Sequence, residues 1–171
     1  ASPDGAAWSL VTDQAPWKGR YAAGGAVFKG RIWVMGGKSE DIYNDVWSSA
    51  DGVRWTLETP NAPWSKRQLF SLAVHDDNLW VIGGGITIYH PFRAYCDVWS
   101  SPDGKTWTQA TDQAPWPVRI WNTVMTYKNR LWVLGGFQAE PTWNNFDDVW
   151  YSPDGAEWCQ LATETIWSPR H

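Results

Sequence analysis

The chain has 171 residues, of which 43% are hydrophobic and 16% aromatic, and its formal net charge at pH 7 is −4. This composition predicts a folded globular protein with a sizeable core. The 14 Lys and Arg residues form no basic cluster, so nucleic acid is not an expected partner. No apolar run approaches the roughly 18 residues of a membrane span, so a membrane is not an expected partner either.

Nearly the same string occurs three times in the chain, and a version of its second half occurs a fourth time. The full string reads DVWSSPDGKTW at 97–107, with copies at 45–55 and 148–158, and the half copy SPDGAAW stands at 2–8. The β-branched and aromatic ends of the string favour strands. Its centre favours a turn, because proline presets φ, the Asp carboxylate accepts nearby backbone N–H groups, and glycine tolerates a positive φ. We therefore expect hairpins, with Asp103 and its equivalents as turn formers.

The first unit begins with a predicted strand over 7–11 and a loop that ends at Arg20. A strand of small residues is expected over 21–28, followed by the turn Lys29-Gly30 and an apolar strand over 31–35. The unbroken apolar run of this last strand predicts burial on both of its faces.

The second and third units repeat this order. Their predicted strands cover 68–75 and 79–82 in the second unit, and 120–127 and 130–134 in the third. Each apolar strand ends in a glycine doublet, and helical periodicity is absent, so each unit is expected to contain four short antiparallel strands. The repeats run approximately over 2–48, 49–100 and 101–151, with a partial fourth over 152–171.

Fourteen of the 16 tryptophans fall at four fixed positions of the repeat. A large apolar indole at constant spacing is expected to pack as a wedge between neighbouring sheets. Only Trp121 and Trp143 lie off this pattern. Four-stranded units with buried middle strands and aromatic wedges predict an all-β fold, a β-propeller whose sheets stack around an axis.

Three such units are too few for a ring, because propellers use about 4 to 8 of them. We expect the ring to close by oligomerisation, with six sheets from two chains, or to be completed by further sheets of a larger propeller. The segments 1–20 and 152–171 are two versions of one sequence, and the first is expected to add an extra N-terminal outer strand.

These residues resemble kelch repeats, in which a strand ends in Gly-Gly, an aromatic residue follows, and an Arg precedes the innermost strand. The doublets at 36–37, 83–84 and 135–136 carry much of the likeness, which covers the whole chain and is greatest to Trp-rich bacterial kelch-like and galactose-oxidase-like repeats. Tyr43 matches the kelch aromatic, but no counterpart stands at a fixed spacing from the other doublets. The turn SPDGxxW also looks like a shortened Asp box of sialidases.

The resemblance implies a propeller fold and favours an extracellular or periplasmic location. The matching arginines of kelch proteins often line the ligand mouth, which implies a binding role for the arginines of this chain. The motif residues themselves are structural in both families, so they support the fold more than the function.

All differences in repeat length fall into one class of loop. The repeats from Ser2 to Ser49, Ser49 to Ser101 and Ser101 to Ser152 have 47, 52 and 51 residues. The loops between each glycine doublet and the next Asp-Val-Trp have 7, 12 and 11 residues, whereas the spacing from each SPDG serine to the next apolar strand is constant. Insertions confined to one face of a repeat protein are a common mark of its binding face.

Antiparallel connectivity places the arginines and both off-pattern tryptophans on the face of these variable loops, and the SPDG turns on the opposite face. The candidate ligand-binding residues are therefore Arg20, Arg67, Arg119, Trp121, Trp143, Tyr43, Tyr89, His90 and Arg93. A second interpretation of the arginines stays open, in which each one stacks on a nearby indole or pairs with an Asp and is structural. The loop aromatics likewise either bind a ligand or fold their loops over the sheet ends.

No catalytic or metal-binding residue and no cofactor is predicted. The histidines His75, His90 and His171 and the cysteines Cys96 and Cys159 stand at unlike repeat positions, which argues against a metal cluster and a disulfide. The acids of the loop face that lie outside the repeat pattern are Glu40, Asp41 and Glu140. None of them is marked as half of the carboxylate pair that glycoside hydrolysis needs.

The sequence thus favours a non-catalytic module that binds a glycan or a protein on the loop face. One alternative is a sialic-acid-processing enzyme of sialidase or epimerase type, because sialidases bind the substrate carboxylate with clustered arginines. Another is a scaffold without a ligand. The expected partners besides the ligand are a second copy of the chain or the remaining sheets of a longer chain.

Overall fold

The structure is a computed structural model that describes residues 1–86, 92–161 and 168–169. These residues form three four-stranded antiparallel sheets and one two-stranded sheet. The first sheet contains β1 (Gly24–Phe28), β2 (Arg31–Met35), β3 (Val46–Ser49) and β4 (Thr56–Thr59). The second contains β5 (Ser71–His75), β6 (Asn78–Ile82), β9 (Val98–Ser101) and β10 (Thr108–Thr111). The third contains β11 (Thr123–Tyr127), β12 (Arg130–Gln138), β13 (Asn144–Ser152) and β14 (Cys159–Gln160), and the small sheet pairs β7 (Gly85–Ile86) with β8 (Arg93–Ala94).

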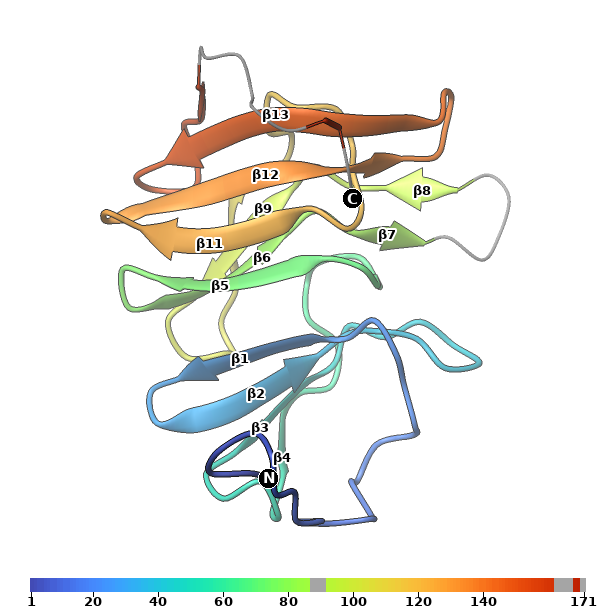
Figure 1. Ribbon diagram of the computed structural model, residues 1–171, viewed down its shortest axis with the longest axis vertical. Helices are drawn as coiled ribbons and strands as arrows, with labels where there is room; N and C mark the ends of the chain where they lie inside the picture. Colours follow the sequence, from blue (N-terminus) through green and yellow to red (C-terminus); the bar gives the residue numbers. More distant parts are fainter. Residues whose placement is uncertain (87–91, 162–167, 170–171) are drawn as a thin grey trace.

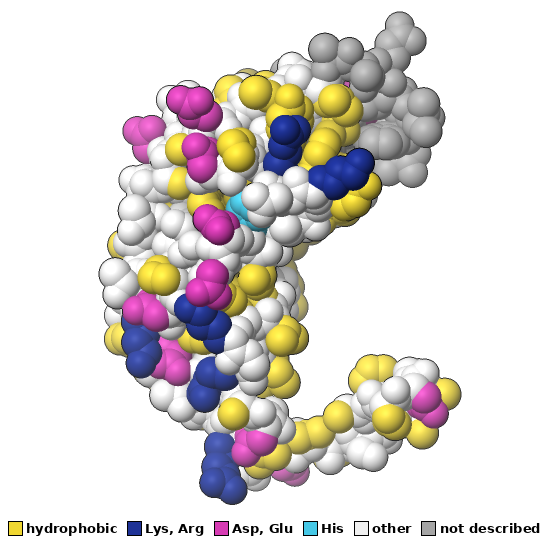
Figure 2. Space-filling view, turned by 90° about the vertical axis from the view of Figure 1, so that its left-hand side faces the viewer, with side chains coloured by type: hydrophobic (Ala, Val, Ile, Leu, Met, Phe, Trp, Pro, Cys, Tyr) yellow, Lys and Arg dark blue, Asp and Glu magenta, His cyan; other side chains and the backbone are white. Residues whose placement is uncertain are grey.

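The three large sheets share one internal order and stack on one another (Figure 1). Their first strands lie next to one another, β1 beside β5 and β5 beside β11. Seen from the side of the turns that follow these strands, the stack has an open, curved outline (Figure 2). The prediction of an all-β fold with four antiparallel strands per unit is confirmed, and none of the sheets closes on itself. The described residues include no helix that is long and apolar enough to span a bilayer.

The hairpins that open the sheets form as the sequence predicts. β1 pairs with β2 from Gly24 and Met35 to Phe28 and Arg31, and the bounds of β2 are the predicted ones. Both turn residues have a positive φ, for example 48° at Lys29 and 68° at Gly30, and non-glycine residues adopt it at 76–77 and 128–129. Two residues of positive φ form the hairpin turn whose twist matches that of the flanking strands.

The first strand of each sheet starts three residues later than predicted. β1, β5 and β11 begin at residues 24, 71 and 123, whereas the sequence predicted starts at 21, 68 and 120. One of the skipped residues in each unit has a left-handed backbone, with φ of 53° at Ala22, 58° at Leu69 and 57° at Trp121. Because an extended strand requires a negative φ, each strand begins only after this residue.

The apolar middle strands are buried on both faces only where sheets cover both faces. In β6, which lies in the second of the three sheets, all residues from Leu79 to Ile82 are buried. In β2, which lies in the first sheet, Ile32 stays exposed. The prediction of two buried faces is therefore confirmed for β6 and wrong for β2.

All four SPDG-type turns use the same hydrogen bonds. Ser101 Oγ accepts the Gly104 N–H at 2.7 Å, and Asp103 Oδ1 accepts the N–H groups of Lys105 and Thr106 at 2.8 and 2.7 Å. The other three turns repeat these bonds. Burial raises the pKa of Asp103, but the N–H groups outweigh burial and hold this pKa below its usual range. The prediction that these aspartates are turn formers is confirmed.

The N-terminal copy forms its turn without a strand after it, so the extra outer strand predicted over 7–11 is wrong. In the other copies, the strand after the turn pairs with the Asp-Val-Trp strand before it, and residues 7–11 have no such partner among the described residues. A strand without a partner leaves its backbone groups to water. Trp8 and Leu10 are accordingly 73% and 81% exposed.

The indoles of Trp33 and Trp80 pack between the sheets, as predicted, whereas Trp8, at another repeat position, is exposed. Trp33 and Trp80 are 3% and 5% exposed, and each Nε1–H donates to the backbone carbonyl five residues earlier. Each ring lies on a turn of the next sheet: a Cβ at Gly104 would lie 2.1 Å from the Trp33 ring, and a Cβ at Gly155 2.0 Å from the Trp80 ring. These turn glycines are therefore required by the packing as well as by their positive φ.

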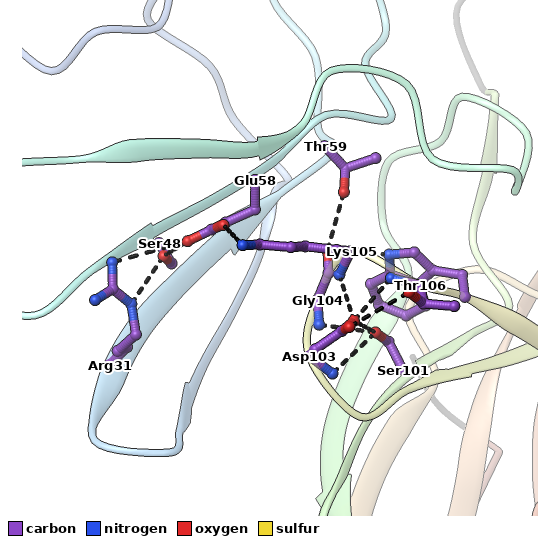
Figure 3. A network of polar contacts seen from close by, with 10 residues as sticks. Arg31, Ser48, Glu58, Thr59, Ser101, Asp103, Gly104, Lys105 and Thr106 are labelled. Carbon is purple, nitrogen blue, oxygen red and sulfur yellow. Dashed lines mark hydrogen bonds and ion pairs between the residues drawn. The ribbon is translucent and has the colours of Figure 1, made fainter.

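A polar network joins the first sheet to the turn of the second (Figure 3). Glu58 on β4 accepts a hydrogen bond from Ser48 Oγ at 2.6 Å and forms an ion pair with Lys105 at 3.1 Å. Thr59 Oγ1 donates to the Gly104 carbonyl at 3.1 Å. Desolvation raises the pKa of Glu58, but Ser48 and Lys105 outweigh it and hold this pKa below its usual range. The network therefore fixes the turn on which Trp33 packs.

The contact of Trp33 with Gly104 can be tested by adding a single methyl group. Gly104→Ala should lower the free energy of unfolding by about 1–3 kcal/mol more than Gly30→Ala, because overpacking adds to the backbone cost. Gly30 is the matched control, since its φ is 68° against 72° at Gly104 and no atom lies within 4 Å of the added Cβ. Urea unfolding of both variants measures the difference, and equal losses would show that the ring does not pack on this turn.

Candidate functional site

A buried arginine closes the base of each variable loop. Arg67 Nη1 and Nη2 donate to the two carboxylate oxygens of Asp97, each at 2.7 Å, and Nη1 also donates to the Gly83 carbonyl at 2.8 Å. Arg20 and Arg119 form the same bonds in the first and third units. The three arginine side chains are 4%, 0% and 0% exposed. The structure thus shows the pairing with Asp that the second interpretation describes, and it leaves these side chains little surface for a ligand.

An aromatic ring covers each guanidinium. The ring centroids of Tyr43, Tyr95 and Phe146 lie 4.3, 4.6 and 4.2 Å from the Cζ atoms of the three arginines. Each ring belongs to the residue two positions before the paired Asp. Tyr43 therefore has counterparts in Tyr95 and Phe146. Their spacing is constant when it is measured back from Asp-Val-Trp, and it varies when it is measured forward from the glycine doublet. A ring face over a guanidinium adds a cation–π attraction to the ion pair.

The carboxylate of Asp148 is stabilised in its charged form. Burial raises the pKa of Asp148, but the hydrogen bonds from Arg119 and Trp150 and the charge of Arg119 outweigh burial, so this pKa lies below its usual value. A lowered pKa in the folded state means that the pair stabilises the fold above the unfolded-state pKa. This stabilisation is lost as the pH falls through the folded-state pKa.

Asp148→Asn should therefore destabilise the fold most at neutral pH. We expect a loss of about 3–5 kcal/mol at pH 7, since the buried charge of Arg119 no longer has a partner of opposite charge. The difference from the wild type should begin to narrow at about pH 4, where the carboxylate of the unfolded state becomes protonated, and should narrow further through the lowered folded-state pKa of Asp148. Urea unfolding between pH 7 and acid measures it, with the exposed Asp13→Asn as control. A pH-independent difference would contradict the role assigned to the Asp148 charge.

The two longer variable loops project on one face of the molecule. The loop of the second unit contains β7 and β8, and the loop of the third prolongs β12 and β13, so that both project at the right of Figure 1. An apolar hollow of about 500 Å³, the aromatic cleft, lies between them. Its lining residues are Phe92, Ile120, Trp121, Phe137, Ala139, Trp143 and Asn145.

Phe137 holds the two off-pattern tryptophans in place. Its ring centroid lies 5.8 Å from that of Trp121 and 5.3 Å from that of Trp143. Phe137 is only 8% exposed, and its backbone exchanges two hydrogen bonds of 2.9 Å with Ile120. The two indoles are 45% and 79% exposed. The aromatic cleft thus presents two open indole surfaces on a buried, hydrogen-bonded base.

The exposure of Trp121 follows from the backbone of the repeat. Ala22, Leu69 and Trp121 occupy equivalent positions and share the left-handed conformation, which costs a non-glycine residue roughly 1–2 kcal/mol. Because all three units adopt it, the conformation belongs to the fold and not to the cleft alone. Only the third unit places an indole there, so a constant backbone feature carries a variable side chain.

A second hollow of about 320 Å³ adjoins the aromatic cleft and adds polar groups. It is lined by Phe92, Arg93, Ala94, Tyr95, Val118, Ile120, Ala139 and Glu140. Phe92, Ile120 and Ala139 line both hollows, so the two are continuous. Arg93 is exposed on β8, and Gln138 Nε2 donates to the Glu140 carbonyl at 2.8 Å across the tip of the third loop.

The structure brings together three of the nine predicted site residues, Trp121, Trp143 and Arg93. Tyr43 lies apart from them, over the Arg20 guanidinium, with its hydroxyl 2.8 Å from Ser39 Oγ. Arg20, Arg67 and Arg119 lie in the buried pairs described above. The predictions for Tyr89 and His90 fall outside the described residues.

The sequence prediction missed Phe137 and Ile120. Phe137 directly follows a glycine doublet, at the position of Lys38 and Gly85, and Ile120 directly follows the third arginine. A comparison of these equivalent positions shows that the third unit alone has a large aromatic residue after its doublet. That difference could have identified Phe137 as a candidate site residue from the sequence.

No group of three or more His, Cys, Asp or Glu side chains lies close enough to hold a metal ion in the described part of the chain. A comparison with models of protein families finds none that matches this chain, and a comparison with curated proteins finds no match either.

Proposed function

We propose that the chain is a non-catalytic carbohydrate-binding module that holds its ligand in the aromatic cleft. The observation that carries this proposal is the pair of exposed indoles, Trp121 and Trp143, that both pack on Phe137 in one hollow. Sugar rings have apolar C–H faces that pack on indoles, while their hydroxyls bind polar groups at the edge of a site. Such polar groups are present, because Asn145 lines the cleft and Arg93 lines the adjoining hollow.

The scaffold proposed for this module is a propeller of kelch-like repeats. Three sheets of equal strand order, stacked with their first strands adjacent along a curved outline, are consistent with this architecture. The glycine doublets and the arginines before each first strand support the kelch-like assignment. Within it, the aromatic cleft lies on the face where all the variable loops stand.

A carbohydrate suits the aromatic cleft better than a protein does. A stable protein interface usually covers about 800 Å² on each partner. The cleft is instead a concave hollow of about 500 Å³, a volume typical of sites for small ligands. Binding of a protein in place of an oligosaccharide would therefore contradict the proposal.

The sialic-acid-processing alternative loses its main support. Its binding site would need the arginine side chains to meet a substrate carboxylate. In the structure Arg20, Arg67 and Arg119 each bind an aspartate of their own unit in a two-bond geometry. A substrate carboxylate would have to displace these aspartates.

Binding to an array of neutral and sialylated oligosaccharides, followed by calorimetry with the strongest binder, tests the proposal. Trp121→Ala and Trp143→Ala should each weaken binding by at least about tenfold, since the stacking of one ring on an aromatic face is lost. Both should keep the wild-type unfolding curve, because Ala22 shows that alanine is tolerated at the Trp121 position and because Trp143 is 79% exposed. Trp8→Ala, which removes a 73% exposed indole outside the cleft, is the matched control and should bind as the wild type does.

The outcomes separate the candidate functions. Binding of an oligosaccharide that both cleft variants retain would refute the site. Binding of proteins but of no oligosaccharide would refute the carbohydrate class, and release of sialic acid from the sialylated probes would establish the enzyme. Arg93→Ala should weaken a sialylated ligand more than a neutral one if the ligand reaches the second hollow.

A further inference from the structure

The contact between neighbouring sheets occurs twice, and each time it joins one indole to one glycine. Trp33 on β2 lies on Gly104 of the second sheet, and Trp80 on β6 lies on Gly155 of the third. Either glycine would place a Cβ within about 2 Å of the ring, which leaves no room for a side chain. Each interface therefore fits a projecting ring into a turn that lacks a side chain.

In each interface a further polar contact reaches the carbonyl of the turn proline, although the two contacts come from different repeat positions. Lys29 Nζ donates to the Pro102 carbonyl at 2.9 Å, and His75 Nε2 lies 2.8 Å from the Pro153 carbonyl oxygen. Each pair thus joins the first β-hairpin of one sheet to the SPDG turn of the next.

The outer face of the third sheet presents an indole of this kind, but no turn glycine packs on it among the described residues. Trp132 on β12 is the counterpart of Trp33 and Trp80, yet it is partly exposed, and no SPDG-type turn of the described residues packs on it. Beside it, Tyr127 is 56% exposed, whereas its counterparts Phe28 and His75 are each 3% exposed. Met125, on the same strand as Tyr127, is 45% exposed.

The outer face of the first sheet carries the glycine half without the indole half. The atoms nearest to a Cβ at Gly52 would be Ile32 Cδ1 at 3.7 Å and Val11 Cγ1 at 3.8 Å, so the place of an indole is open. Ile32 is 43% exposed, whereas its counterparts Leu79 and Leu131 are fully buried by the preceding sheet. Val11 belongs to the N-terminal segment that joins no sheet, so its side chain can move aside for an indole without breaking a sheet.

We propose that these two faces bind each other between two copies of the chain, with Trp132 of one copy on Gly52 of the other. The chain already forms this indole–glycine interface twice between its own sheets. A second copy of the chain supplies the missing glycine for Trp132 and the missing indole for Gly52, so we identify the partner as a second copy. Two copies related by a two-fold axis form two identical interfaces of this kind, which closes a ring of six sheets. Six lies within the range of about 4 to 8 that such rings use.

The duplicated ends of the chain are compatible with this ring. Ser2–Trp8 and Ser152–Trp158 are two versions of one turn. The second version belongs to the third sheet, where its Gly155 covers Trp80, whereas no atom lies within 4 Å of a Cβ at Gly5 in the first. The first version is therefore left outside the ring. The proposal is independent of the carbohydrate-binding function.

Sedimentation velocity and light scattering of the whole chain over the micromolar range test the proposal. The wild type should have twice the 19.4 kDa mass of one chain. Gly52→Ala should raise the dissociation constant of the dimer by at least about tenfold, because the added methyl group occupies the place of the indole. Trp132→Ala should have a similar effect through the other half of the contact.

Gly5→Ala is the matched control, since Gly5 lies in the same kind of turn with φ of 77° against 75° at Gly52 and has no atom near the added Cβ. It should dimerise as the wild type does. A monomeric wild type, a mass above that of two copies, or equal dissociation constants for Gly52→Ala and Gly5→Ala would overturn the proposal. Circular dichroism identifies any variant that unfolds. If Gly52→Ala unfolds, the mass of the wild type and the dissociation constant of Trp132→Ala test the proposal without it.

Discussion

The arrangement of each unit depends on one buried ion pair between an arginine and an aspartate. Arg67 binds Asp97 through two hydrogen bonds and the Gly83 carbonyl through a third, so it connects three chain segments at one point. These segments are the approach to the first strand, the end of the second strand and the start of the third. An isolated buried charge would be strongly destabilising, and the two-bond geometry with a covering aromatic ring makes the pair tolerable.

This pair explains why variation is confined to one loop. It fixes both ends of the segment between the glycine doublet and Asp-Val-Trp, so the residues between them can number 7, 12 or 11 without a shift of the sheets. The opposite face has no such freedom, because its turns hold glycines on which the indoles of neighbouring sheets pack. One face of the repeat is therefore constrained by packing, and the other is free to carry a site.

The aromatic cleft arises from side-chain replacement on this constant frame. The left-handed position holds Ala22, Leu69 or Trp121, and the position after the doublet holds Lys38, Gly85 or Phe137. The third unit alone has aromatic residues at both positions. The proposed binding site thus needs no special backbone, and the conformational cost at Trp121 is one that every unit bears.

The repeat made much of the fold predictable, because turn chemistry and indole spacing are local signals. The bounds of β2, the turn role of Asp103 and the packing of Trp33 all followed from residues that lie close in sequence. The late start of the first strands and the missing strand at residues 7–11 did not, since the first depends on a left-handed residue without glycine and the second on a pairing partner. The candidate site was predicted in part: Trp121 and Trp143 stood out as exceptions to the repeat, but their contact with Phe137 depends on how two loops fold.

The central claim is that the aromatic cleft binds the ligand. Nuclear magnetic resonance tests it most directly, by following the indole N–H signals of the protein while an oligosaccharide that binds is added. Trp55, Trp107 and Trp158 donate their indole N–H groups to turn carbonyls on the constrained face, so their signals should not move. The indole signals of Trp121 and Trp143 should shift together and saturate with one dissociation constant. Shifts confined to the turn indoles, with the signals of Trp121 and Trp143 unchanged, would contradict the assignment of the binding site to the aromatic cleft.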